Sequence, residues 1–121
     1  MGAVSWVDLT FAAEGAGTRV TLRHTAKASD LPPGMWDQFG PGAVGSGLEG
    51  GYLGLQMYLD APDAPRDAAA MAVWPGTPEG RAFFSQSAEA WARAAIAGGE
   101  DTAKMQATVP ALIAFYTGAP A

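Results

Sequence analysis

Hydrophobic and polar residues alternate along the first 25 residues of the chain, and this period of two is typical of strands with one buried face. The residues that share the apolar side are Val7, Leu9 and Phe11 in the run 4–11, and Val20, Leu22 and His24 in the run 18–25. Between the two runs, the glycine-rich segment 14–17 is suited to a tight turn that needs positive φ. The pattern therefore predicts an antiparallel β-hairpin over residues 4–25.

A helical spacing follows in residues 43–59, where large apolar residues recur every three or four positions. They are Val44, Leu48, Tyr52, Leu55 and Leu59. A second stripe of the same spacing consists of Gly47, Gly51 and Gly54. Because glycine costs about 0.5–1 kcal/mol against alanine in a helix, this stripe predicts a helix packed closely on a sheet or on another helix. The alternative is a partly irregular segment.

The second half of the chain predicts more helices, each delimited by recognisable end signals. Asp30 is a candidate cap for a short turn after the hairpin, and residues 67–74 form a candidate short helix that stops before a proline. Thr77, with a proline after it, predicts the start of a helix that runs to residue 97. A last helix is expected with either Asp101 or Thr102 as its cap, and Pro110 is expected to kink it or split it in two.

Composition narrows the class of protein. The 121 residues suit one domain, and the net charge of −5 argues against nucleic-acid partners, which usually require a basic face. The chain has no cysteine, which excludes disulfides and thiolate metal sites and favours a reducing compartment, so a cytoplasmic location is expected. No apolar run approaches the ~20 residues that span a bilayer, so no membrane association is expected.

Few residues point to chemistry, and we expect no catalytic motif, no metal site and no cofactor. His24, the single histidine, lies on the apolar strand side and could bond a ligand, although a core histidine fits as well. Glu49 lies in an otherwise apolar helix, where it could face either a ligand or solvent. Four aromatic residues could line a ligand pocket, or they could simply fill the core: Trp36, Phe39, Tyr52 and Trp91.

The order of the motifs resembles the SRPBCC, or START-like, superfamily. The resemblance rests on residues 17–24, Gly-Thr-Arg-Val-Thr-Leu-Arg-His, followed by residues 36–45, Trp-Asp-Gln-Phe-Gly-Pro-Gly-Ala-Val-Gly. More narrowly, these segments are similar to bacterial homologues of the activator of heat shock protein 90 ATPase. The run at 79–83 and the segments at 90–91 and 115–118 are similar to the C-terminal extension of an actinobacterial branch of that family.

The resemblance implies a helix-grip fold, in which a curved antiparallel sheet wraps a long helix around an apolar cavity. Residues 1–60 would then be the C-terminal part of such a domain, with the hairpin packed on the helix 43–59, and residues 61–121 a helical extension. His24 would match an inward histidine that closes the last strand, and Leu22, Trp36, Phe39, Glu49 and Tyr52 would complete the ligand-binding set. The first strand and several middle strands of the family are missing from this sequence, so the expected class is α+β with a partial helix grip.

The leading functional expectation is a START-like domain that binds a small apolar molecule without catalysing a reaction. One alternative is a co-chaperone or protein-interaction module, as the family resemblance also implies. The other is an enzyme related to polyketide cyclases, which only His24 and Glu49 could serve. Because two strands cannot wrap a cavity, the chain is expected either to be a piece of a longer protein or to associate with itself through the sheet edge.

Overall fold

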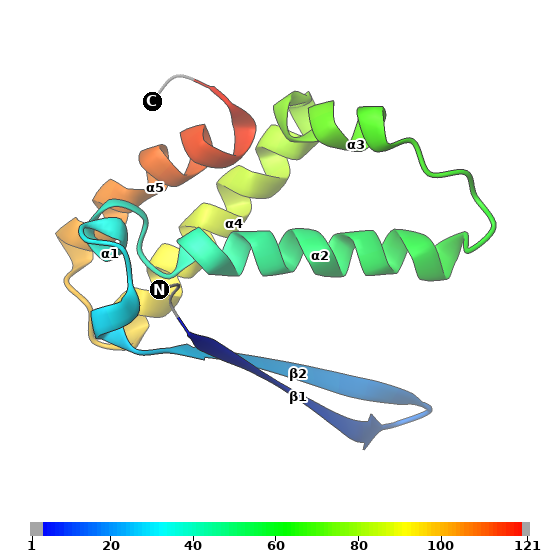
Figure 1. The fold of residues 1–121 in the computed structure, drawn as a ribbon, viewed down its shortest axis with the longest axis horizontal. Coiled ribbons are helices and arrows are strands. Elements are labelled where there is room, and N and C mark those ends of the chain that lie inside the picture. The colour runs from blue at the N-terminus through cyan, green and yellow to red at the C-terminus, as the bar shows by residue number, and fades with distance from the viewer. Residues whose placement is uncertain (1–3, 120–121) are drawn as a thin grey trace. The chain divides into compact units, whose positions relative to one another are not determined.

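The hairpin forms where the alternation predicts it. In the computed structural model of the chain, which describes residues 4–119, strand β1 (Ser5–Glu14) pairs antiparallel with strand β2 (Gly17–Ala26) (Figure 1). The pairing runs without interruption from Ser5 opposite Ala26 to Glu14 opposite Gly17. Together with the helices that follow, this hairpin makes the chain an α+β protein.

A two-residue loop closes the hairpin and fixes this register. Gly15 has a φ of +56°, while no residue other than glycine has a positive φ in the described part of the chain. A positive φ at the first loop position alone fits a type II′ turn, whose twist matches that of the two strands. Next to the loop, Glu14 accepts an ion-paired hydrogen bond from Arg19.

The rest of the described chain is helical, and its order agrees with the sequence spacing (Figure 1). A short 3-10 turn at Ala28–Asp30 and another at Trp74–Gly76 accompany the longer helices. The helices are α1 (Met35–Phe39), α2 (Gly42–Asp60), α3 (Ala68–Val73), α4 (Pro78–Ala97) and α5 (Thr102–Thr117). Asp67, Thr77 and Asp101 cap the starts of α3, α4 and α5 with their side-chain oxygens. The caps at Thr77 and Asp101 were expected from the sequence, whereas the cap at Asp67 was not.

Two expectations about helix ends need correction. Asp30 does not cap a helix, since it is the last residue of the first 3-10 turn, and α1 begins only at Met35 after Gly34. Pro110 does not split α5, which continues as one helix from Thr102 to Thr117. Proline has no N–H, so one backbone hydrogen bond of the helix is missing at Pro110. The helix nevertheless continues on both sides of that residue.

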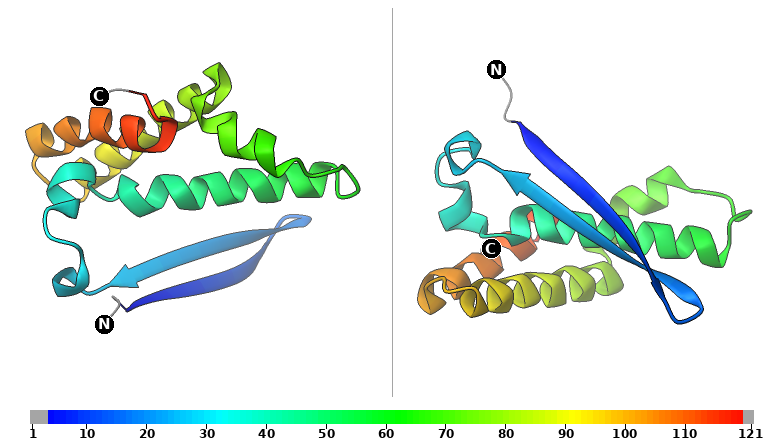
Figure 2. Two further views of the ribbon diagram at one scale, coloured as in Figure 1. Left: turned by 45° about the horizontal axis from the view of Figure 1, so that its top comes forward. Right: turned by 90° about the horizontal axis from the view of Figure 1, so that it is seen from below.

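The core lies where α4 and α5 pack against each other, with α1 on α5 and α2 on α4 (Figure 2). Its buried apolar side chains are Phe84, Ala88, Ala92, Met105 and Leu112. Aromatic rings extend this core. The ring of Phe84 stacks on that of Tyr116, with the two centroids 4.7 Å apart and the planes nearly parallel. The helical unit is thus held by α4 and α5, and α2 is fixed to it through α4.

The chain divides into two compact units, and the boundary between them along the chain lies between Pro33 and Gly34. The hairpin belongs to the first unit, and all the helices from α1 to α5 belong to the second. We expected a division at residue 60, with α2 grouped with the hairpin. Within its own compact unit, α2 contacts α1, α4 and α5.

Candidate functional site

A buried polar contact joins α2 to α4. The Ser87 hydroxyl of α4 lies 2.8 Å from the Oγ atom of Ser46 and also hydrogen-bonds to Oε2 of Glu49, both on α2. A hydroxyl has one proton, and an ionised carboxylate can only accept, so Ser87 donates to Glu49 and accepts from Ser46. The side chains of Ser46 and Ser87 are 1% and 6% exposed, whereas Glu49 is half-buried. Glu49 therefore has a fixed partner instead of pointing freely into solvent.

Glycines in α2 bring the two helices close enough for this contact. An ideal Cβ atom built on Gly45 would lie 2.1 Å from Cε2 of Trp91, which is part of α4. A Cβ atom on Gly42 would lie 2.2 Å from Cδ2 of Leu112. Only residues without a side chain allow α2 to approach Trp91 and Leu112 at these distances. The close helix–helix packing that the glycine content predicts is therefore present in the first half of α2.

Two further polar groups border this contact. The indole Nε1 of Trp91 is buried and has no hydrogen-bond partner among residues 4–119. The hydroxyl of Tyr116 donates to the backbone oxygen of Ala43 at 2.7 Å. Burial raises the pKa of Tyr116, and a backbone hydrogen bond from Gly47 partly opposes that rise. Where α2, α4 and α5 meet, the Tyr116 hydroxyl therefore has a hydrogen-bond partner. The buried Trp91 indole N–H has none among residues 4–119.

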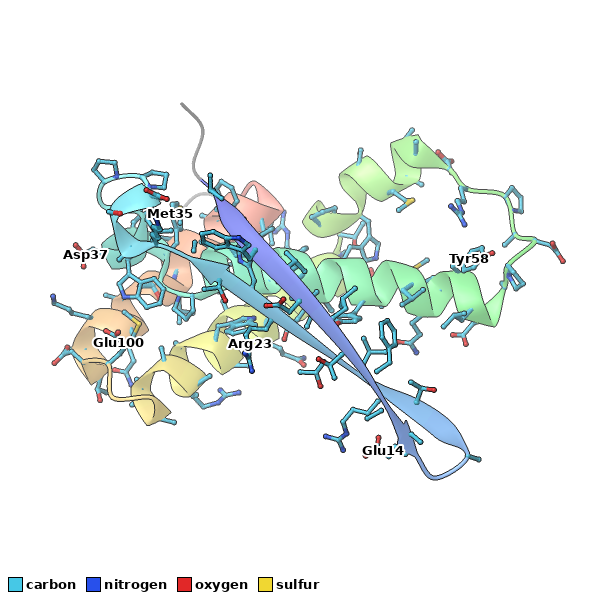
Figure 3. The ribbon with its side chains drawn as sticks, turned by 60° about the horizontal axis from the view of Figure 1, so that its bottom comes forward. Glu14, Arg23, Met35, Asp37, Tyr58 and Glu100 are labelled. Atoms are coloured by element: carbon cyan, nitrogen blue, oxygen red, sulfur yellow. The ribbon has the colours of Figure 1, made fainter. Side chains whose placement is uncertain are left out.

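The second half of α2 carries large apolar side chains that remain exposed. Tyr52, Leu55 and Leu59, which lie on one helical stripe, are 40%, 48% and 67% exposed. No atom of the described chain lies within 4 Å of ideal Cβ positions on Gly51 and Gly54. The helix therefore leaves its packing partners about halfway along its length, as the extended end of α2 near Tyr58 illustrates (Figure 3). At this end, the guanidinium of Arg66 lies 4.9 Å from the ring centroid of Tyr58.

The hairpin presents an apolar face of its own. Cross-strand pairs place Val7 opposite His24, Leu9 opposite Leu22, and Phe11 opposite Val20. Since side chains alternate along a strand, these six residues share one face, while Asp8 and Arg23 form a pair on the other. Both strands lie in one layer, so the hairpin itself does not cover this apolar face.

The residues that we predicted as a binding set lie on separate elements of the two compact units. Trp36 and Phe39 lie on α1, where Phe39 packs against Phe115 of α5 with ring centroids 5.3 Å apart and Trp36 is 39% exposed. Glu49 and Tyr52 lie on α2, and Glu49 alone enters the polar contact with Ser87. Leu22 and His24 lie on the apolar face of β2, and His24 is exposed. The six residues thus occupy three different elements.

Sequence reasoning missed the partners of Glu49. Ser87 was not among the predicted site residues, and its pairing with Ser46 was not expected. A weak signal exists: Ser46 and Glu49 are three residues apart in a helix, so they lie on one face of α2. In residues 4–119, no group of three or more histidine, cysteine or acidic side chains is placed to hold a metal ion, and none of the helices there combines the length and apolarity of a membrane span.

We expect Ser87→Ala to lower the free energy of unfolding by about 1 kcal/mol, because it removes a charge-assisted hydrogen bond whose loss water can partly replace at the half-buried Glu49. Urea denaturation of the purified variant measures this change. Ser85→Ala, two residues away on the same helix, is the control and should change stability less. In a Glu49→Gln background, the Ser87→Ala effect should shrink. An unchanged effect in that background would show that Ser87 acts independently of Glu49.

Comparisons of the chain with models of protein families, with curated proteins and with solved structures found no match. The fold and the contacts described above therefore carry the functional argument.

Proposed function

We propose that the chain is a START-like domain protein, of the helix-grip kind, that binds a small apolar molecule. The observation that carries this proposal is the one-sided hairpin, on which Val7, Leu9, Phe11, Val20 and Leu22 share one face. Burial of such a face contributes about 25 cal/mol per Å² of apolar surface. A flat or elongated apolar molecule, held between this face and further apolar surface, would gain that contribution.

The second half of α2 supports the proposal independently. Tyr52, Leu55 and Leu59 form a stripe of the kind that a helix presents to an apolar cavity. The buried Trp91 indole supplies a donor without a partner, and apolar sites commonly use a few such polar groups to orient a ligand. His24 at the end of the apolar strand face is a second candidate for this role.

A ligand that binds only the folded chain should raise its melting temperature. At a hundred times the dissociation constant, the expected stabilisation is about 2.7 kcal/mol. Straight-chain fatty acids and fused-ring aromatic compounds are suitable probes, measured by differential scanning fluorimetry. We expect Leu22→Asp to abolish the shift, because it places a charge on the apolar strand face.

Thr21→Asp is the matched control, since Thr21 is the neighbouring residue on the opposite face of the same strand. It should leave the shift produced by the probe unchanged. Equal shifts in Leu22→Asp and Thr21→Asp would contradict binding at the apolar face. If no probe of either class shifts the melting temperature of the unaltered chain, binding of these apolar classes is excluded.

A protein-interaction role, such as that of a co-chaperone, is the second candidate, and one observation favours it. Apolar side chains are exposed on several sides of the last turns of α2 and along α3. They are Leu55, Met57, Tyr58, Leu59, Met71 and Val73. Exposed apolar surface of this kind commonly marks contacts with other proteins. A co-chaperone would change the ATPase rate of its chaperone without any small ligand, which separates the two functions.

We propose in addition that copies of the chain associate through the edge of the sheet. A two-stranded sheet is marginally stable by itself, and three or more strands with an apolar face are needed for independent stability. Pairing of two hairpins would give four strands with one continuous apolar face.

A further inference from the structure

Resting on the proposed self-association, we infer that β1, and not β2, is the edge that pairs, with Leu9 of one copy opposite Leu9 of a second copy. The two strands differ in how their edges are protected. β1 is ten residues long and contains no proline, glycine, lysine or arginine. β2 carries Arg19 and Arg23, and Lys27 follows it directly. Charged residues, lysine above all, are among the devices that keep an edge strand unpaired.

The register of the hairpin determines which backbone groups of β1 point outward. In a two-residue hairpin, the residues that flank the loop, Glu14 and Gly17, exchange both backbone hydrogen bonds. Because such pairs alternate along an antiparallel ladder, the even-numbered residues of β1 bond to β2. The odd-numbered ones, including Leu9, present their N–H and C=O groups to the open side. Those are also the residues whose side chains form the apolar face.

Self-pairing centred on Leu9 matches the sequence of β1 with itself. In an antiparallel arrangement, it places Val7 opposite Phe11 of the copy on the apolar face. On the other face, it places Asp8 opposite Thr10 and Trp6 opposite Ala12. Nine residues of each strand pair in this way, from Ser5 to Ala13. No two charges of the same sign lie directly opposite each other.

The two registers centred on the other apolar-face residues, Phe11 and Val7, are less favourable. Centring the pair on Phe11 would place Asp8 directly opposite Glu14 of the copy, and like charges at opposed positions destabilise a sheet. Centring it on Val7 would pair only the residues from Ser5 to Leu9. The Leu9 register combines an overlap of nine residues with no directly opposed like charges. It joins the apolar faces of two hairpins into one four-stranded surface, with the strand count that independent stability requires.

Single cysteines test this arrangement, because the chain has none of its own. Residues that exchange hydrogen bonds across an antiparallel pair have Cα atoms about 5.5 Å apart, within the range of a disulfide. Under mild oxidation, Leu9→Cys should form a covalent dimer in most chains. Leu22→Cys, at the corresponding place on β2, should remain monomeric on a non-reducing gel. Light scattering of the unaltered chain should give twice the monomer mass.

A second pair of variants guards against local damage at residue 9. A mixture of Val7→Cys and Phe11→Cys chains should form a mixed disulfide, while neither variant should cross-link efficiently with itself. Circular dichroism of each variant checks that the hairpin is retained.

A monomer in light scattering would overturn the proposed self-association. Cross-linking of Leu22→Cys without cross-linking of Leu9→Cys would keep self-association but overturn the choice of β1. A dimer in light scattering without any of the expected disulfides would overturn the register. None of these measurements includes a ligand, so failure of the ligand proposal would leave them unchanged.

Discussion

Replacing Gly45 with alanine is expected to lower the free energy of unfolding by about 2–3 kcal/mol. The new Cβ atom would lie 2.1–2.6 Å from three atoms of the Trp91 indole, which are Cε2, Cζ2 and Cδ2. The indole is a rigid ring and cannot bend away locally, so α2 must separate from α4. That separation also strains the hydrogen bonds between Ser87 and α2. The gain in helix propensity from glycine to alanine, about 1 kcal/mol, offsets only part of the cost.

Gly51→Ala is the matched control in the same helix. No atom of the described residues lies within 4 Å of its ideal Cβ position, so only the propensity gain remains. We expect this variant to be more stable than the unaltered chain by about 0.5–1 kcal/mol. Chemical denaturation followed by circular dichroism measures both variants. Similar changes of the same sign at the two positions would show that α2 does not pack on Trp91 as described.

Leu112→Ala is expected to cost about 2–5 kcal/mol, because Leu112 is 2% exposed and its truncation leaves a cavity between α5 and α2. The same residue limits what can stand at position 42. A Cβ atom on Gly42 would lie 2.2 Å from Cδ2 of Leu112, the atom that this truncation removes. Gly42→Ala should therefore be destabilising in the unaltered chain and much less so, or even stabilising, in the Leu112→Ala background.

A double-mutant cycle measures the interaction free energy between positions 42 and 112. Residues in direct contact show interaction free energies of about 0.5–3 kcal/mol, and here we expect the double variant to be more stable than the sum of the two single changes. The cycle of Leu112→Ala with Gly51→Ala is the control, since Gly51 has no neighbour to lose. Additive effects in the Gly42 cycle would contradict the close approach of α2 to α5.

The hairpin is the part of the fold that the sequence predicts best. Period-two alternation and a glycine turn are local signals, and together they determine the strands, the loop and the register of Leu9 with Leu22. The helix starts at Thr77 and Asp101 were predictable for the same reason, because capping depends on neighbouring residues. For Pro110 the sequence left a kink or a split open, and the structure excludes the split, because a helix held by tertiary packing tolerates the loss of one backbone hydrogen bond.

The sequence predicted that α2 packs closely on another element, but it did not predict at which glycines the closest contacts lie. The glycine content indicated a close approach, and the stripe of Gly47, Gly51 and Gly54 was the expected site. The structure confirms a close approach at Gly47, where a Cβ atom would lie 2.9 Å from the Tyr116 hydroxyl. The closest approaches of α2 are at Gly42 and Gly45, while Gly51 and Gly54 have open space around them. Spacing along one helix shows which residues share a face, but it does not show how far the partner helix extends.

The polar contact illustrates the same limit. Glu49 could be identified from the sequence as an unusual acidic residue in an apolar helix, whereas Ser87 was not singled out. Their hydrogen bond joins residues 38 positions apart in the chain. Such pairs depend on which helices pack together and on their relative register, and a single sequence contains no direct record of either.

The division of α2 into a packed half and an open half has a mechanical consequence. The helix has 19 residues and is therefore about 28 Å long. It is clamped near Gly42 and Gly45, where side chains leave no room for movement, whereas its far end is unsupported. A rigid helix that is fixed at one end transmits a force from its other end. A force applied near Leu59 would therefore be transmitted along the helix to the contact of Ser46 and Glu49 with Ser87, where α2 meets the core.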